Sequence, residues 1–114
     1  MMVKLFVMAK RKKGISREEC LKHWQEVHAP LILKTLPGVK KYVQNHALTL
    51  PVAGEPPFDG LAELWFDDLE SWRKAADFYM GDSGKIIRDD EENFLDVHSH
   101  QSFVCEEIVI KDNP

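Results

Sequence analysis

The stretch from Ser16 to Pro30 constrains the fold of this chain more than any other part of the sequence. Its first residue precedes Glu19 by three positions, so that each side chain can accept a hydrogen bond from a backbone N–H of the first helical turn. This spacing predicts a helix that begins near Arg17.

The predicted helix has one apolar face that carries a histidine. At about 100° per residue this face comprises Cys20, Leu21, Trp24, Val27, His28 and Leu31. His28 should therefore point inward, whereas His23 lies at the edge of the face and is predicted to be a surface group. Because Pro30 lacks an N–H and disfavours helical backbone at the residue before it, the helix should end or kink just after His28.

Composition limits the class of protein. A chain of 114 residues suits a single domain, residues 1–114, that a partner subunit would help to stabilise. No apolar run approaches the roughly 20 residues that cross a bilayer, and the N-terminus lacks the pattern of a signal peptide. We expect a cytoplasmic protein without membrane contact.

The net charge of −4 argues against a nucleic-acid partner, so we interpret the basic cluster Lys10 to Lys13 as a solvated loop. Cys20 and Cys105 are expected to be reduced, buried thiols.

The remaining chain predicts strands and helices in alternation. The predicted strands are Val3–Lys10, Val39–Leu50, Gly60–Phe66 and Gln101–Lys111. A bent turn over residues 31–36 should stop at Pro37-Gly38, and the proline-rich loop Pro51–Asp59 could cover a site. A helix after Asp68 should bury Leu69, Trp72, Ala76, Tyr79 and Met80. A further helix, Ser83 to Leu95, should bury Ile86, Ile87, Phe94 and Leu95, with Arg88, Asp89, Asp90, Glu91 and Glu92 solvated on its outer face.

This order of elements is typical of a ferredoxin-like βαββαβ fold, an α+β architecture with a four-stranded antiparallel sheet and helices on one face. The other face would expose large side chains, among them Lys4, Phe6, Met8, Leu61, Trp65 and alternate residues of the last strand. Such a face needs a cover, and the sheet of a second copy provides one. We therefore expect a homodimer with the two sheets facing each other.

Three motifs in this sequence resemble those of the EthD family, within the dimeric α+β barrel superfamily. They are His23-Trp24-x-x-x-His28-Ala29-Pro30-Leu31, the turn Pro37-Gly38, and Phe58-Asp59-Gly60-x-Ala62-Glu63-Leu64-Trp65-Phe66. The resemblance implies a pocket between sheet and helices in each subunit. It also implies that His28 corresponds to a histidine taken as catalytic in a lactone isomerase, whose catalytic cysteine is replaced here by Leu64.

The resemblance and the pattern together suggest a site around His28. Imidazole titrates near neutrality, so an inward histidine can serve as a general acid or base; the alternative is a packed histidine tied to a carbonyl. The residues expected to contact the substrate are Trp24, Tyr42, His46, Asp59 and Leu64. Of these, His46 could instead be an ordinary strand residue and Asp59 a turn residue. Glu63 must face away from Leu64, so we assign it to the dimer side.

We expect neither a cofactor nor a metal. The pair His98 and His100 shares one face of a strand, but no third ligand lies at a helpful spacing, and His23 and His28 would point about 140° apart on an α-helix.

Two functions are consistent with these features. The first is a homodimeric EthD-like enzyme that acts on a small aromatic, lactone or polyketide-like substrate by cofactor-free acid/base chemistry, of isomerase, dehydratase/lyase or oxidoreductase type. The alternative is a non-catalytic ligand-binding or accessory protein of a degradative or biosynthetic pathway. A purely structural subunit is a third possibility.

Overall fold

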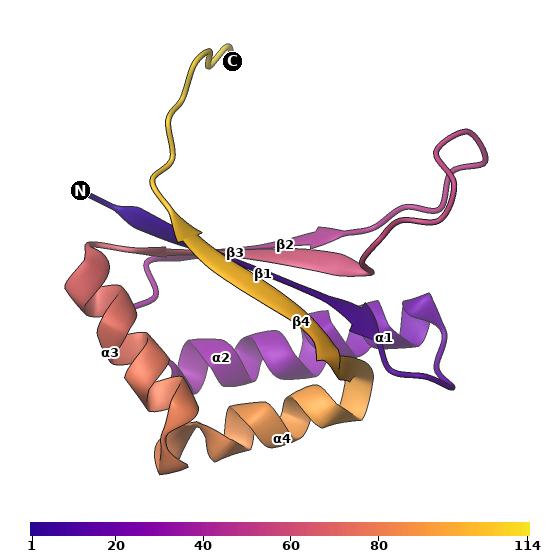
Figure 1. The fold of residues 1–114 in the computed structure, drawn as a ribbon, viewed down its shortest axis with the longest axis horizontal. Coiled ribbons are helices and arrows are strands. Elements are labelled where there is room, and N and C mark those ends of the chain that lie inside the picture. Colours follow the sequence, from indigo (N-terminus) through magenta and orange to yellow (C-terminus); the bar gives the residue numbers. More distant parts are fainter.

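The computed structural model describes every residue from 1 to 114, as one layer of strands and one of helices (Figure 1). The strands are β1 (Val3–Arg11), β2 (Lys41–His46), β3 (Gly60–Phe66) and β4 (Leu95–Cys105). The helical segments are α1 (Arg17–His23), the π-helix η1 (Trp24–His28), α2 (Ala29–Thr35), α3 (Leu69–Met80), the 3₁₀ turn η2 (Asp82–Gly84) and α4 (Lys85–Phe94). No helix has the length and apolarity needed to cross a membrane.

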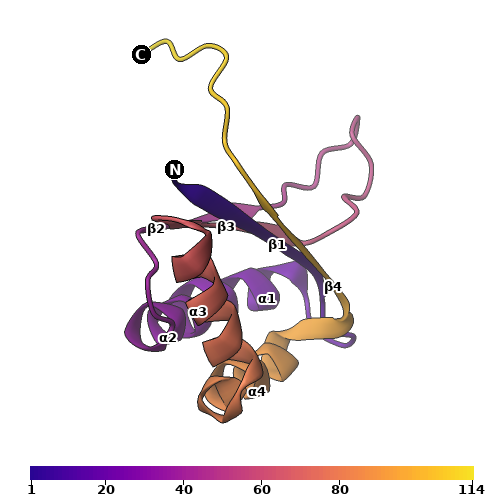
Figure 2. The ribbon, with the colours of Figure 1, turned by 60° about the vertical axis from the view of Figure 1, so that its left-hand side comes forward.

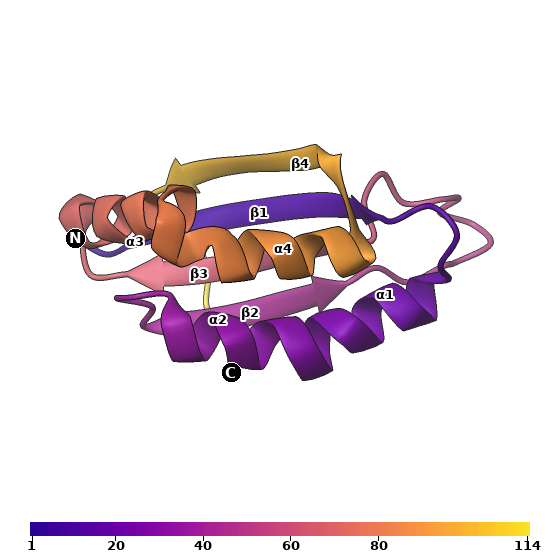
Figure 3. The same ribbon diagram turned by 90° about the horizontal axis from the view of Figure 1, so that it is seen from below.

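The sheet has the strand order β2-β3-β1-β4, and every neighbouring pair is antiparallel. All the helices lie on one side of it, with α1, η1 and α2 in a row beneath β2 and α4 in a second row beneath the central strands (Figure 3). The predicted ferredoxin-like fold is therefore confirmed. The core lies between the layers and contains Val3, Cys20, Trp24, Ile32, Ala62, Leu64, Phe66, Ala75, Ile87 and Phe94.

The first helix begins as predicted but does not break at its proline. Ser16 and Glu19 form the full capping box, and α1 starts at Arg17. One π turn then joins α1 to α2 without interruption, with the N–H of Ala29 donating to the carbonyl of Trp24, five residues earlier. Pro30, which has no N–H to donate, directly follows this wider turn, in the first turn of α2.

The π turn also shifts which side chains are buried after it. An extra residue in one turn moves the inward position from Leu31 to Ile32, which is buried, whereas Val27 is 48% exposed. The prediction that Val27 and Leu31 belong to the buried face was therefore wrong for Val27 and incomplete for Leu31, which is half-buried.

Several predicted boundaries were wrong. The second strand stops at His46 instead of Leu50, and the last strand runs from Leu95 to Cys105 instead of Gln101 to Lys111. The reason for the latter is that β1 pairs with the chain directly after α4, so Leu95 lies opposite Arg11. The loop between β2 and β3 projects away from the body (Figure 1), and its Val52 is 98% exposed; of the predicted loop Pro51–Asp59, only Asp59 lines the cavity between sheet and helices.

The buried faces of the last two long helices also differ from the prediction. Leu69 and Met80 are exposed at the two ends of α3, which runs away from the sheet (Figure 1), and Ala75 is buried in its middle. On α4, Ile86 is exposed and Glu91 is buried. The inner face of α4 follows the spacing Ile87, Glu91, Phe94, so one acidic residue of the run faces inward.

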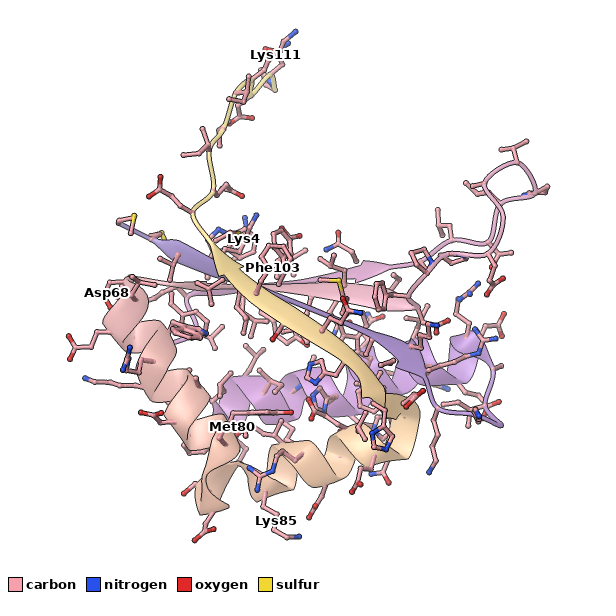
Figure 4. All side chains as sticks on the ribbon, viewed as in Figure 1. Lys4, Asp68, Met80, Lys85, Phe103 and Lys111 are labelled. Carbon is pink, nitrogen blue, oxygen red and sulfur yellow. The ribbon has the colours of Figure 1, made fainter.

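The opposite face of the sheet carries no helix. The C-terminal segment and the β2–β3 loop both leave the domain on this side (Figure 2). Lys4 and Phe103 lie on it, while Met80 and Lys85 lie on the helical side (Figure 4). The rings of Phe6 and Phe103 are 5.1 Å apart there, and Phe103 is 53% exposed.

Candidate active site

A cavity of about 280 Å³ lies between the sheet and the helices. Hydrophobic residues make up 19 of the 25 that line it. Met80 on α3 and Ser102 on β4 line the cavity and are themselves exposed, so they mark its opening. The six other lining residues are His28, Asp59, Gly60, Glu91, His100 and Ser102, and the hydroxyl-bearing Tyr42 and Tyr79 also lie on the wall.

His28 is buried on the wall of this cavity and is fixed by a carboxylate. Its Nδ1 lies 2.8 Å from Oδ2 of Asp90, and only 4% of the residue is exposed. The other oxygen of Asp90 lies 2.9 Å from Nε2 of His23, and both imidazoles pack on the ring of Phe94. One carboxylate on α4 therefore holds both histidines of the first helix.

This arrangement overturns two predictions. His23 is not a free surface group, and Asp90 is not part of a solvated run. Five residues correspond to about 140° on an α-helix, but the hydrogen bonds of a π turn join residues five apart and bring His23 and His28 to the same side. Burial of α4 against this side then places Asp90 between them.

Burial and the carboxylate of Asp90 together set the protonation of His28. Burial is the largest influence and lowers the pKa of His28 below its ordinary value, although the carboxylate of Asp90 acts in the opposite direction. Burial alone would raise the pKa of Asp90, but the hydrogen bonds from His28 and His23 outweigh it and lower that pKa. Asp90 is thus an ionised acceptor, so Nδ1 of a neutral His28 carries the proton. Its Nε2, which has no hydrogen-bond partner within the chain, is left as a base at the cavity.

A second polar pair lies on the cavity wall. The hydroxyl of Tyr79 donates to Oε1 of Glu91 at 2.5 Å, and Glu91 is only 8% exposed. Burial raises the pKa of Glu91 to about 7, and it also raises the pKa of Tyr79. Sequence analysis missed Glu91 because it lies in an acidic run. The available signal was its spacing, four residues after Ile87 and three before Phe94.

Three of the predicted contact residues line the cavity in positions suited to touch a ligand. Leu64 on β3 and Trp24 on η1 are buried, and Tyr42 on β2 is half-buried, with its hydroxyl accepting from Gln44. Gly60 allows the close approach of Trp24, since a Cβ at Gly60 would lie 2.5 Å from Cζ3 of the indole.

The other two predicted contact residues, His46 and Asp59, are engaged with neighbouring side chains. His46 does not line the cavity; it stacks on Trp24 with the rings 5.2 Å apart and bonds to Gln44. Asp59 does line it, but accepts from the backbone and guanidinium of Arg11 and from Arg17. Burial opposes its charge, yet these bonds prevail and hold the pKa of Asp59 below its ordinary value.

The strand pattern places Glu63 on the opposite face, as predicted. Its carboxylate lies 3.0 Å from Nζ of Lys4 and accepts from Asn45.

His100 lines the cavity and its Nε2 is buried without a partner, whereas His98 is exposed. No three His, Cys, Asp or Glu side chains lie close enough together to hold a metal ion. Both cysteines are free; Cys20 is buried and Cys105 is half-buried.

Most of this chain matches the sequence model of one protein family. The model of the EthD domain matches residues 12–98, which include the His28 segment, β3 and α4. This chain belongs to the EthD family. No functionally curated protein matches it.

Solved structures of EthD proteins have the same fold. An ethyl tert-butyl ether D family protein from Bacillus halodurans C-125 is 27% identical, with a TM-score of 0.71, over 95% of this chain and 100% of that one. An EthD-like protein from Ralstonia eutropha JMP134 is 20% identical, with a TM-score of 0.74, over 96% and 95%. A dimeric ferredoxin-like protein of unknown function from Thermobifida fusca YX is 10% identical, with a TM-score of 0.65, over 92% and 90%.

Proposed function

We propose that this EthD protein is an enzyme that acts on a small aromatic, lactone or polyketide-like molecule by acid/base chemistry of its own side chains. The reaction would be of the isomerase, dehydratase/lyase or oxidoreductase type. The observation that carries the proposal is the buried His28, whose Nδ1 is 2.8 Å from Asp90 and whose opposite nitrogen borders an apolar cavity.

This geometry supports the role of a general base. A base is effective when a further group orients it, and Asp90 fixes both the ring and the tautomer of His28. Burial keeps the imidazole neutral near pH 7, so Nε2 is available to accept a proton. Once His28 is protonated, the adjacent carboxylate would stabilise the cation.

The cavity supports a compact, largely apolar substrate. An apolar cavity of about 150 Å³ holds benzene, so about 280 Å³ suits a compound of one or two rings. In this proposal Trp24, Tyr42 and Leu64 touch the substrate. His46 holds the indole of Trp24 in place, and Asp59, which is paired with Arg11 and Arg17, lies on the cavity wall.

We further propose that the protein is a homodimer that forms through the helix-free face of its sheet. The Thermobifida fusca relative is described as dimeric. The ammonium of Lys4 lies in this face between two carboxylates and over the half-buried rings of Phe6 and Trp65. Phe103 on the same face is 53% exposed, and apolar surface left exposed in this way supports an interface. Two free cysteines are in keeping with a cytoplasmic location.

The first experiment is thermal unfolding against a panel of lactones, phenols and polyketide-like aromatics, followed by product analysis for each compound that binds. A ligand at about a hundred times its dissociation constant should stabilise the wild type by roughly 2.7 kcal/mol. His28→Ala should abolish turnover and leave the protein folded. His98→Ala, which removes an exposed histidine, is the matched control and should retain turnover.

Full turnover by His28→Ala would remove the central residue of the proposal. Stabilisation by a compound that is never converted would instead favour the alternative, a ligand-binding or accessory protein, for which the apolar wall of the cavity would suffice.

A further inference from the structure

The cavity wall carries two groups suited to proton transfer. We propose that Glu91 is a second catalytic residue, which donates a proton to the oxygen of a neutral carbonyl substrate while His28 removes a carbon-bound proton from the same molecule. This inference rests on the proposed function of His28 and names the partner acid and the substrate class.

The two groups are held in fixed relation by α4. Asp90 and Glu91 are consecutive, so their side chains leave the helix about 100° apart. Asp90 is bound to His28, and Glu91 faces the cavity and Tyr79. Close packing at Gly84 fixes α4 against the end of α3, since an added Cβ would lie 2.2 Å from the carbonyl oxygen of Tyr79.

The hydrogen bond from Tyr79 assigns roles to the two oxygens of Glu91. Oε1 accepts from the Tyr79 hydroxyl, and Oε2 has no partner within the chain. A proton on the carboxyl group is therefore carried by Oε2, from which it can be donated to a ligand. Tyr79 positions the acid and does not itself need to transfer a proton.

The surroundings of Glu91 raise its pKa, so that protonated and ionised forms are both present near pH 7. Burial is the largest influence, and together with the neighbouring charge of Asp90 it raises the pKa to about 7, against the effects of Tyr79 and Arg88. Besides Tyr79, the remaining titratable groups on the wall are Cys20 on α1, His28 on η1, His100 on β4, Tyr42 on β2 and Asp59 before β3.

The charge of the wall selects a neutral substrate. No lysine or arginine lines the cavity, and the acidic groups on it are Glu91 and the ion-paired Asp59. A substrate carboxylate would lose its hydration there without gaining a cation, which is costly. A ketone, lactone or quinone-like ring has an acceptor oxygen for Glu91 and carries no charge.

The proposed step balances in protons and electrons. Nε2 of His28 takes a proton from the carbon next to the carbonyl, the electron pair of that C–H bond forms the C=C bond of an enol, and the carbonyl oxygen receives the proton of Glu91. The imidazolium then returns its proton to the same carbon or to a conjugated one, while the enol O–H returns its proton to Glu91. Return to a different carbon isomerises the substrate without a redox change.

One test uses the resting protein and needs no substrate. Carbon-13 NMR of selectively labelled glutamate follows each side-chain carboxyl carbon through a pH titration, with Glu91→Gln to assign the Glu91 signal. We expect a midpoint near 7 for Glu91. Titration in the ordinary range of an exposed glutamate would overturn the inference.

A second test measures the proton transfer with 2-tetralone, a neutral two-ring ketone, as the probe. Deuterium uptake from heavy water at the carbons beside its carbonyl is followed by NMR, after subtraction of the rate without protein. Glu91→Gln should exchange about 10²-fold more slowly than the wild type, with an unchanged dissociation constant. Glu92→Gln, an exposed neighbour on the same helix, should exchange at the wild-type rate.

The outcomes separate the two proposals. Exchange that His28→Gln abolishes and Glu91→Gln leaves unchanged overturns the role of Glu91 and leaves the proposed function intact. Binding of 2-tetralone without any exchange by the wild type overturns both. Failure of 2-tetralone to bind, together with binding of its carboxylated analogue, overturns the assignment of a neutral substrate.

Discussion

His23 and His28 bind the two oxygens of a single carboxylate, that of Asp90, at 2.9 and 2.8 Å. An unbroken α-helix would direct them to different sides, and the π turn between them removes that difference. π turns inside α-helices are frequent at functional sites. Here the turn places His23 and His28, the candidate base, where both can bind Asp90.

Substitution of the shared carboxylate should weaken both the fold and the site. Asp90→Asn replaces an ionised acceptor by a neutral amide, so the two hydrogen bonds lose their charge assistance. We expect the free energy of unfolding at pH 7 to fall by about 2 kcal/mol, measured by urea unfolding. The His28 pKa, followed by ring-proton NMR, should fall further, because Asp90 raises it in the wild type.

The control for this prediction is Asp89→Asn. Asp89 is exposed and pairs only with Lys85 on the surface, so its loss should change stability by less than about 0.5 kcal/mol. Equal effects of the two substitutions would mean that the carboxylate of Asp90 gives no particular support to the histidines.

A methyl group at Gly60 should displace the indole of Trp24. The added Cβ would lie 2.5 Å from the indole, and overpacking of this kind costs about 1–3 kcal/mol. We expect Gly60→Ala to lower the free energy of unfolding by that amount. Trp24→Leu in the same chain should recover part of the loss, as a double-mutant cycle would reveal. Simple additivity of the two changes would contradict a direct clash.

Stability should fall as the pH rises past the ordinary range of a glutamate, because of Glu91. Its pKa is raised from 4.5 to about 7 in the folded protein, so the folded state binds more protons than the unfolded state between these values. This stabilisation is complete below about pH 4.5 and is lost as the pH rises through about 7. The wild type should therefore lose about 3 kcal/mol relative to Glu91→Gln between pH 4.5 and pH 8.

The measurement is urea unfolding of both proteins at each pH, since the difference between them cancels most other titrations. Glu92→Gln serves as the control and should show no such trend relative to the wild type, because Glu92 is exposed. A constant difference between wild type and Glu91→Gln would show that Glu91 titrates alike in both states.

A charge on the helix-free face should dissociate the proposed dimer. Phe103 is 53% exposed and packs beside Phe6, so Phe103→Glu would place two carboxylates, one from each copy, in the apolar interface. We expect sedimentation to change from dimer to monomer. Ile86→Glu, at an exposed position on α4 on the other side of the molecule, should remain dimeric. Dissociation by both substitutions would point to a different interface.

Much of this protein was predictable from local pattern. The Ser16–Glu19 capping box set the start of the first helix, and strand alternation placed Leu64 on the cavity side and Glu63 on the other. These predictions succeeded because a capping box depends on one turn of backbone and strand parity on a period of two, and neither requires a distant partner.

Only the tertiary structure decided the partners of the candidate base. Asp90 and Glu91 belong to an acidic run that is predicted from the sequence to be solvated. Their contacts in the structure depend on which side of α4 packs against α3 and the first helix. The π turn over Trp24–His28, just before Pro30, was likewise not predicted from the sequence. The periodicity of the sequence determined which residues share a face of a helix or strand. Contacts between elements distant in the sequence determined which of those faces line the candidate site.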